Sequence, residues 1–246
     1  MMTIVFSTAA PSLIVMTVDS SVTLDFPERR EYITGRKAYL LPGVGCVATW
    51  GARDGNQIGR FLGKQEITSN NYSVEGLASL VFKYLREDYC PHDRNLDDVG
   101  YHVAGFDRNG HARLFHVFYG FDRPRPSEQK EQEYKIYDHS PASGTASFLY
   151  NGRNDLAEIM VHTLLGQIQR GVPTHFDLTK PEGLISFGDF VTRFAGELTP
   201  EVGPPFLTHV ISPKNQAGRL TNDGFCPLDL DEVRKKLRKL EGNNEI

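Results

Sequence analysis

The chain has 246 residues, of which 39% are hydrophobic and 24% are charged, and its formal net charge is −4. This length and composition predict one large α/β domain with a packed core. The slightly acidic balance, with a pI near 6.1, gives no reason to expect nucleic-acid or membrane binding. The three cysteines are widely spaced without a CxxC pair, which is typical of a reducing compartment. The start lacks a basic region and is broken by Pro11, and no apolar run approaches the roughly 20 residues of a membrane span, so a cytoplasmic protein is expected.

The first predicted elements are two strands. Ile4-Val5-Phe6 and Leu13-Ile14-Val15-Met16 are apolar runs, separated by the turn-like Ala9-Ala10-Pro11-Ser12. Short apolar runs bounded by turn residues are typical of buried strands, so this stretch predicts a hairpin.

Polar residues stand at the ends of the predicted strands. Thr3 begins the first strand, Asp19 ends the second, Lys37 opens a third and Gly51 follows it. A threonine hydroxyl becomes a useful nucleophile when a base lies beside it, and the α-amino group of an N-terminal threonine can be that base. A buried lysine would lower the pKa of the hydroxyl, an aspartate would pair with the lysine, and a backbone N–H would hold the oxyanion. Thr3, Lys37, Asp19 and Gly51 supply one candidate for each role.

These residues resemble the N-terminal third of a proteasome-type β-subunit, a member of the N-terminal-nucleophile (Ntn) hydrolases. As in that family, Asp19 lies sixteen residues after Thr3, and Thr23 lies four residues after Asp19. Gly51 lies fourteen residues after Lys37, again as in the family, whereas the interval from Asp19 to Lys37 is two residues longer. The resemblance implies catalytic roles for Thr3, Asp19, Lys37 and Gly51. It also implies a substrate cleft lined by Ser20, Ser21, Thr23 and Ala52.

One departure from the family concerns the start of the chain. Thr3 is preceded by Met1 and Met2, whereas the mechanism needs a free threonine amine. Either translation starts at Met2 and ordinary processing exposes Thr3, or the chain stays blocked unless it cleaves itself.

The remaining elements follow from hydrophobic periodicity. Charged residues between Asp25 and Arg36 predict a solvated turn. Apolar positions at helical spacing predict helices at residues 52–66, 73–89, 156–168 and 187–198, the last opened by Ser186. Apolar runs predict a hairpin at residues 99–119 and strands at residues 134–137 and 206–211. Residues 228–241 form an amphipathic pattern that predicts a C-terminal helical tail.

Two further segments are compared with the family. Asn151-Gly152 stands where the family places a Ser-Gly segment that supports the nucleophile, with asparagine replacing serine. The family also places an acidic residue and a second Ser-Gly near the site, for which Glu197 and Glu201 are both candidates. His102, His111 and His116 match no recognised metal-ligand spacing, so no metal site is predicted.

Together the elements predict a single domain, residues 1–246, built as a four-layer αββα sandwich of the Ntn-hydrolase type, with antiparallel sheets inside and helices outside. The predicted function is hydrolysis of peptide bonds by an N-terminal threonine, which needs no metal or organic cofactor. The resemblance implies a homo-oligomeric ring or barrel and a peptide or protein substrate, and no feature identifies an ATPase regulator. Two alternatives stay open: a catalytically inactive scaffold or binding subunit, and an Ntn amidase acting on a small amide.

Overall fold

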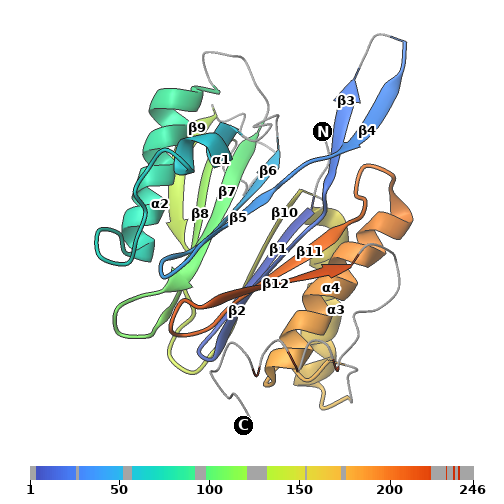
Figure 1. The fold of residues 1–246 in the computed structure, drawn as a ribbon. Coiled ribbons are helices and arrows are strands. Elements are labelled where there is room, and N and C mark those ends of the chain that lie inside the picture. The colour runs from blue at the N-terminus through green and yellow to red at the C-terminus, as the bar shows by residue number, and fades with distance from the viewer. Residues whose placement is uncertain are drawn as a thin grey trace.

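The computed structural model describes residues 4–25, 28–51, 57–91, 98–120, 132–152, 154–172 and 176–222, together with residues 231, 235 and 238. Two five-stranded sheets and a separate two-stranded hairpin contain the strands of these residues, and all the strand pairs are antiparallel. The two large sheets lie between two groups of helices (Figure 1). The prediction of an α/β chain with antiparallel sheets is confirmed.

The first large sheet has the strand order β10-β1-β2-β11-β12. Its strands are β1 (Ile4–Ala10), β2 (Leu13–Val18), β10 (Ser147–Gly152), β11 (Phe206–Ile211) and β12 (Ala217–Asn222). Every residue of β1 and β2 is buried, as expected for adjacent strands inside a sheet that is covered on both faces. The predicted N-terminal hairpin is therefore confirmed, whereas β12 was not predicted.

The second large sheet has the strand order β5-β6-β7-β8-β9. Its strands are β5 (Ala38–Leu41), β6 (Gly45–Gly51), β7 (Val99–Phe106), β8 (Ala112–Gly120) and β9 (Glu133–Asp138). The β7–β8 pair is the hairpin that the sequence predicts, and Gly110, with φ +78°, occupies its turn.

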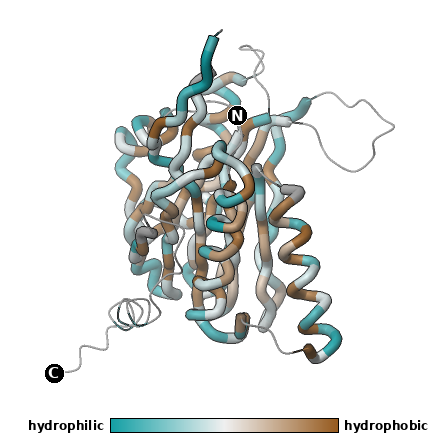
Figure 2. The backbone as a smooth tube through the Cα atoms, turned by 90° about the vertical axis from the view of Figure 1, so that its right-hand side faces the viewer, coloured by the Kyte–Doolittle hydropathy of each residue, from teal (hydrophilic) through white to brown (hydrophobic). Residues whose placement is uncertain are grey.

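Helices cover the outer face of each sheet. Helices α1 (Gln57–Leu62) and α2 (Val74–Lys83) and the π-helical turn η1 (Tyr84–Tyr89) supply the apolar side chains packed against β7 and β8. Helices α3 (Asn154–Gln169) and α4 (Pro181–Leu198) belong to the other group, and α4 contacts β1, β2 and β11. Both α3 and α4 alternate between hydrophilic and hydrophobic positions in the view that faces them (Figure 2). Among the described residues, no helix is long and apolar enough to cross a membrane.

The side-chain alternation of β1 shows how one strand serves two cores. Val5 and Ala9 face the second sheet and join the apolar cluster between the sheets. Ile4 and Phe6 point the other way and pack with α3 and α4. This period of two is the pattern of a strand buried on both faces, and it places Ser7 between the sheets as well.

Two local predictions are corrected. The charged segment between Asp25 and Arg36 is not only a turn, because β3 (Ser21–Asp25) pairs with β4 (Arg30–Thr34) in a hairpin that projects from the body (Figure 1). The residues of β4 are mostly exposed, so its sequence lacks the apolar signal of a buried strand. Helix α4 begins at Pro181 rather than beside Ser186, since proline suits the first turn of a helix.

The predicted C-terminal tail lies almost wholly outside the described residues. Within it, Asp231, Lys235 and Arg238 are helical and exposed.

The aromatic cluster under α4 provides a test of packing. The Phe187 side chain is 2% exposed, and its ring centroid lies 5.5 Å from that of Phe6 and 5.3 Å from that of Phe176. Replacing Phe187 with alanine should lower the free energy of unfolding by about 3–5 kcal/mol, because the lost contacts leave a cavity. Phe194→Ala on the same helix, where the side chain is 40% exposed, is the matched control and should cost less than about 1.5 kcal/mol. Urea unfolding measures both, and equal losses would contradict this packing.

Candidate functional site

The Asp19 carboxylate lies just after β2 and holds the start of β1. Its Oδ1 accepts hydrogen bonds from Lys37 Nζ at 2.8 Å and from the Ile4 backbone N–H at 3.0 Å. Its Oδ2 accepts a hydrogen bond from the Ser21 N–H at 3.0 Å. The Ile4 nitrogen belongs to the peptide bond that joins Thr3 to Ile4, so Asp19 fixes the backbone next to the predicted nucleophile.

Lys37 approaches Asp19 from the other sheet, immediately before β5. The Lys37–Asp19 salt bridge is buried, with the two side chains 7% and 0% exposed. Burial lowers the pKa of the Lys37 ammonium, and the nearby Asp19 carboxylate opposes that shift. A lysine held in this state can act on a neighbouring hydroxyl as a positive charge or take part in proton transfer.

The segment between α4 and β11, which is distant from Asp19 in the sequence, also contacts the site. The Gly203 N–H donates to Asp19 Oδ2 at 3.4 Å, and the Ser20 N–H donates to the Gly203 carbonyl at 3.0 Å. The Ser20 hydroxyl donates to the Pro205 carbonyl at 2.6 Å. Gly203 and Pro205 were not among the predicted site residues, since backbone groups carry no side-chain signal in the sequence.

The two acidic candidates, Glu197 and Glu201, lie at the end of α4 and just after it. Glu201 forms an ion pair with Arg30 of β4 at 2.7 Å, and Glu197 lies in the last turn of α4. The contact that this segment makes with Asp19 comes from a glycine N–H instead.

The predicted substrate residues begin directly after Asp19. Ser21 and Thr23 are buried on β3, at the base of the projecting hairpin. Within the described part of the chain, the Thr23 hydroxyl has no hydrogen-bond partner. Substrate binding by Ser20, Ser21 and Thr23 stays a prediction, and Ala52 lies outside the described residues.

Gly51 ends β6, opposite Val99 of β7. Its φ is +84°, and a Cβ atom added there would lie 2.1 Å from the Asp98 carbonyl oxygen. Only glycine fits both the backbone conformation and the space. The predicted oxyanion role of the Gly51 N–H remains a prediction, as does the nucleophilic role of Thr3, which lies outside the described residues.

Asn151 and Gly152 end β10 beside the start of β1. Gly152 is opposite Ile4 in the sheet and Asn151 is opposite Val5. The Asn151 side chain is engaged between the sheets, where its Oδ1 lies 2.7 Å from His102 Nε2. The location next to the start of β1 agrees with a supporting role, which stays a prediction.

A buried network continues from Asn151 that the sequence reasoning missed. His102 Nδ1 lies 2.8 Å from the Ser7 hydroxyl, so the ring bridges β1, β7 and β10. Burial lowers the pKa of His102 to about 3, and the ring is therefore neutral near pH 7. A neutral ring that donates a hydrogen bond from Nε2 to Asn151 Oδ1 accepts a hydrogen bond from the Ser7 hydroxyl at Nδ1. Ser7 and His102 are 0% exposed, so this serine–histidine pair serves packing between the sheets rather than attack on a substrate.

Other reactive groups are shielded or dispersed. Burial raises the pKa of the Cys46 thiol to about 12, which makes it a core residue rather than a nucleophile. Among the described residues, no group of three or more His, Cys, Asp or Glu side chains is placed to hold a metal ion.

Comparison with solved structures identifies the architecture. The chain matches Anbu from Pseudomonas aeruginosa, solved as a helical assembly, at 16% identity with a TM-score of 0.60, covering 97% of this chain and 94% of that one. It has the Anbu fold. Anbu from Yersinia bercovieri, described as an ancestral beta-subunit, matches at 13% identity with a TM-score of 0.58 over 97% of both chains. Anbu from Hyphomicrobium sp. strain MC1 matches at 11% identity with a TM-score of 0.57 over 98% of both chains.

These neighbours correct the predicted family. The proteasome-type β-subunit assignment is wrong, because the matching structures are Anbu proteins, one of them described as an ancestral beta-subunit. No protein-family model matches the sequence, and no curated protein matches it. At identities of 11–16% the likeness defines the fold alone.

Variants of Asp19 and Lys37 test whether the two buried charges stabilise each other. Asp19→Ala should lower the free energy of unfolding by about 3–5 kcal/mol, because it leaves the Lys37 ammonium buried without its carboxylate. The double variant Asp19→Asn/Lys37→Met buries no unpaired charge and should lose markedly less. Chemical unfolding compares the two variants. A double variant less stable than Asp19→Ala would show that the pair is not electrostatically coupled.

Proposed function

We propose that this chain is an N-terminal-nucleophile hydrolase that cleaves amide bonds, with peptides as its substrates, through Thr3. The observation that carries the proposal is the Asp19 carboxylate, which holds both the Lys37 ammonium and the backbone N–H of the residue after Thr3. The Anbu fold supports it by likeness of architecture. The finer arrangement proposed is the four-layer αββα sandwich of Ntn hydrolases, with the site at one end of the two sheets.

The proposed reaction begins when the Thr3 hydroxyl attacks the substrate carbonyl carbon. The free α-amino group of Thr3 takes the hydroxyl proton and returns it to the departing amine, leaving an ester on Thr3. Water then hydrolyses the ester and regenerates the hydroxyl. Lys37 lowers the pKa of the hydroxyl, Asp19 orients Lys37, and the Gly51 N–H holds the oxyanion. All these groups belong to the chain, so the reaction requires no metal or organic cofactor.

The surroundings of the reaction are part of the same proposal. Ser20, Ser21, Thr23 and Ala52 line the substrate cleft, and Asn151 and Gly152 support the start of β1. The helical assembly of the Pseudomonas aeruginosa protein supports a homo-oligomer for this chain as well. The protein is proposed to work in the cytoplasm.

The proposal requires a chain that begins at Thr3, and this can be measured directly. Intact mass and N-terminal sequencing of the purified protein should show Thr3 as the first residue. Such a chain should hydrolyse peptides, and Thr3→Ala should reduce the rate to background, a loss of at least about 10³-fold, because it removes the nucleophile.

Matched variants separate this mechanism from its alternatives. Thr3→Ser keeps a hydroxyl and should retain measurable turnover, while Ser7→Ala removes a buried hydroxyl and should leave the nucleophile in place. A chain that keeps Met2 and hydrolyses nothing would favour the inactive scaffold. Turnover of small amides but not of peptides would favour the amidase.

A further inference from the structure

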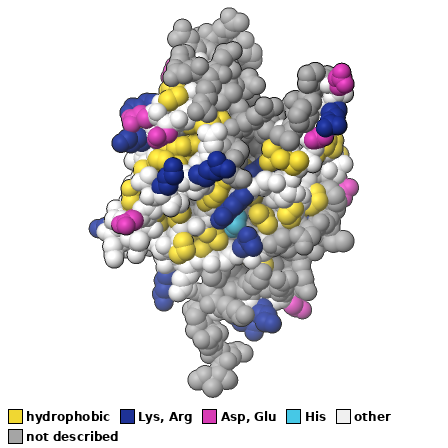
Figure 3. Space-filling view, turned by 45° about the horizontal axis from the view of Figure 1, so that its top comes forward, with side chains coloured by type: hydrophobic (Ala, Val, Ile, Leu, Met, Phe, Trp, Pro, Cys, Tyr) yellow, Lys and Arg dark blue, Asp and Glu magenta, His cyan; other side chains and the backbone are white. Residues whose placement is uncertain are grey.

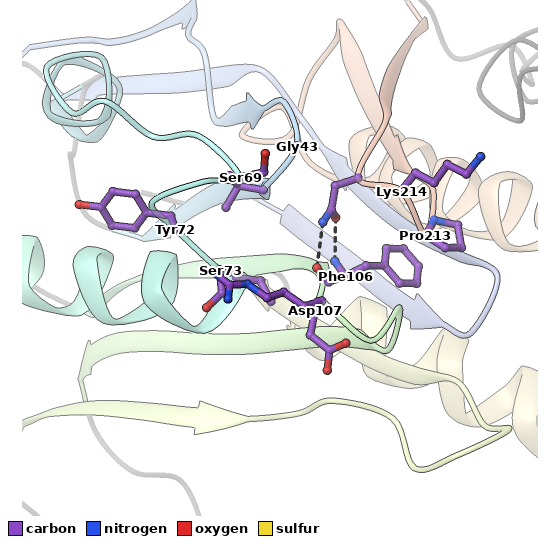
Figure 4. Close-up of a pocket in the computed structure, with 12 residues that line it drawn as sticks. Gly43, Ser69, Tyr72, Ser73, Phe106, Asp107, Pro213 and Lys214 are labelled. Carbon is purple, nitrogen blue, oxygen red and sulfur yellow. Dashed lines mark hydrogen bonds between the residues drawn. The ribbon is translucent and has the colours of Figure 1, made fainter.

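The seam is the part of the apolar layer between the sheets that lies at their edge strands and contains Ala38 and Leu40 of β5 and Ala217 of β12. β5 is an edge strand of one sheet and β12 is an edge strand of the other. Asn215 lies in the β11–β12 turn, and its side chain donates to the carbonyl of Phe106, the last residue of β7, at 2.8 Å and accepts from the Phe106 N–H at 2.8 Å (Figure 4). The Gly43 N–H also donates to the Asn215 carbonyl, at 3.2 Å. The seam is therefore held shut at the end away from the Asp19–Lys37 pair.

His209 lies on β11, inside this seam. Its neighbours on the same face of the strand, Leu207 and Ile211, pack into the apolar cluster between the sheets, so His209 points the same way. The side chain is only 3% exposed, and within the described residues neither ring nitrogen has a hydrogen-bond partner. Buried polar nitrogens normally have partners, so this ring can receive a group that the described residues do not supply.

Two arginines adjoin this ring. Arg219 lies directly opposite His209 in the β11–β12 pairing, and Arg36 comes from the segment before β5. Burial, followed by the positive charges of Arg219 and Arg36, lowers the pKa of His209 to about 4. Basic side chains gather around a histidine in the middle of the face drawn in Figure 3.

Arg36 is also held in a fixed orientation. Its Nε donates to the Ala38 carbonyl at 3.0 Å, and its guanidinium lies 4.8 Å from the centre of the Tyr39 ring. The Tyr39 hydroxyl donates back to the Arg36 carbonyl at 3.1 Å. An arginine ordered before a ligand arrives loses less conformational entropy on binding.

The basic group lies within reach of the reaction centre. Arg36 directly precedes Lys37 in the sequence. Leu207 is opposite Val18, the residue before Asp19, and His209 lies two residues further along β11. His209 is thus opposite Met16, three residues before Asp19, and three residues of a strand span roughly 10 Å, which is also the span of three residues of an extended peptide.

We propose that His209, Arg36 and Arg219 form a carboxylate-binding subsite that takes a carboxylate of the substrate two or three residues from the bond that is cut. This rests on the proposed hydrolysis at Thr3, and it adds an acidic substrate class. Guanidinium groups bind carboxylates through paired N–H donors, and the neutral imidazole adds one N–H donor. The carboxylate comes from an acidic side chain or from the C-terminus of the peptide.

Binding to the full-length Thr3→Ala variant tests the subsite without turnover. The probes are N-acetylated, C-amidated alanine pentapeptides that carry glutamate at each position in turn, their glutamine counterparts, and an alanine pentapeptide with a free C-terminus. We expect at least one carboxylate peptide to bind about tenfold more tightly than its neutral counterpart. The same peptide should shift the ¹⁵N signals of His209, assigned with His209→Gln. The position of the preferred carboxylate separates a side chain from a C-terminus.

Variants of the two arginines test whether these side chains cause the preference for carboxylate peptides. Arg36→Gln and Arg219→Gln should each reduce the ratio of affinities for the carboxylate and neutral peptides at least threefold. Arg170→Gln, at an exposed position just after α3, should leave this ratio unchanged. Equal binding of charged and neutral peptides, or no binding of any, would overturn the subsite. A His209 shift with inorganic phosphate but with no peptide would overturn its assignment to a peptide carboxylate. If the protein prefers carboxylate peptides but a chain that begins at Thr3 hydrolyses none of them, only the proposed reaction is contradicted.

Discussion

Burial of the Asp19 carboxylate is the constraint around which the site is arranged. A buried carboxylate is costly unless donors surround it, and here the donors come from Lys37, Ile4, Ser21 and Gly203. Ser21 lies two residues from Asp19 in the sequence and Gly203 lies 184 residues away, so satisfying one carboxylate brings together both sheets, the base of the β3–β4 hairpin and the segment before β11. The same bonds fix the backbone beside Thr3, which links the stability of the fold to the geometry of the proposed reaction.

The two sheets meet through a mostly apolar layer that contains a few polar groups. Ser7, His102 and Asn151 satisfy one another there, which gives the layer a fixed register. His209 lies in the same layer and has no such partner among the described residues. The contrast between the two histidines explains their different assignments, since one completes a structural network and the other faces a basic group near the site.

Local signals predicted much of the fold, whereas long-range contacts escaped them. Strands such as β1 and β2 are continuous apolar runs and were recognised, but the exposed β4 has no apolar pattern. The pairing of Lys37 with Asp19 was predicted from the chemistry of the two residues and the family resemblance, and their contact is present. Gly203 meets Asp19 across 184 residues through a backbone N–H, which no sequence motif records. The family was misassigned because the spacing of four residues is a short signal, whereas the solved structures that match the whole chain are Anbu proteins.

The proposed role of the Asp19–Lys37 pair is to activate the Thr3 hydroxyl. Incubating a chain that begins at Thr3 with a β-lactone, which acylates activated hydroxyl groups, and mapping the adduct by peptide mass spectrometry tests this most directly. A single adduct on Thr3, formed at least about 10²-fold more slowly after Lys37→Met, is the predicted result. An adduct on another residue, or equal rates of adduct formation for the two proteins, would show that the Asp19–Lys37 pair does not activate Thr3.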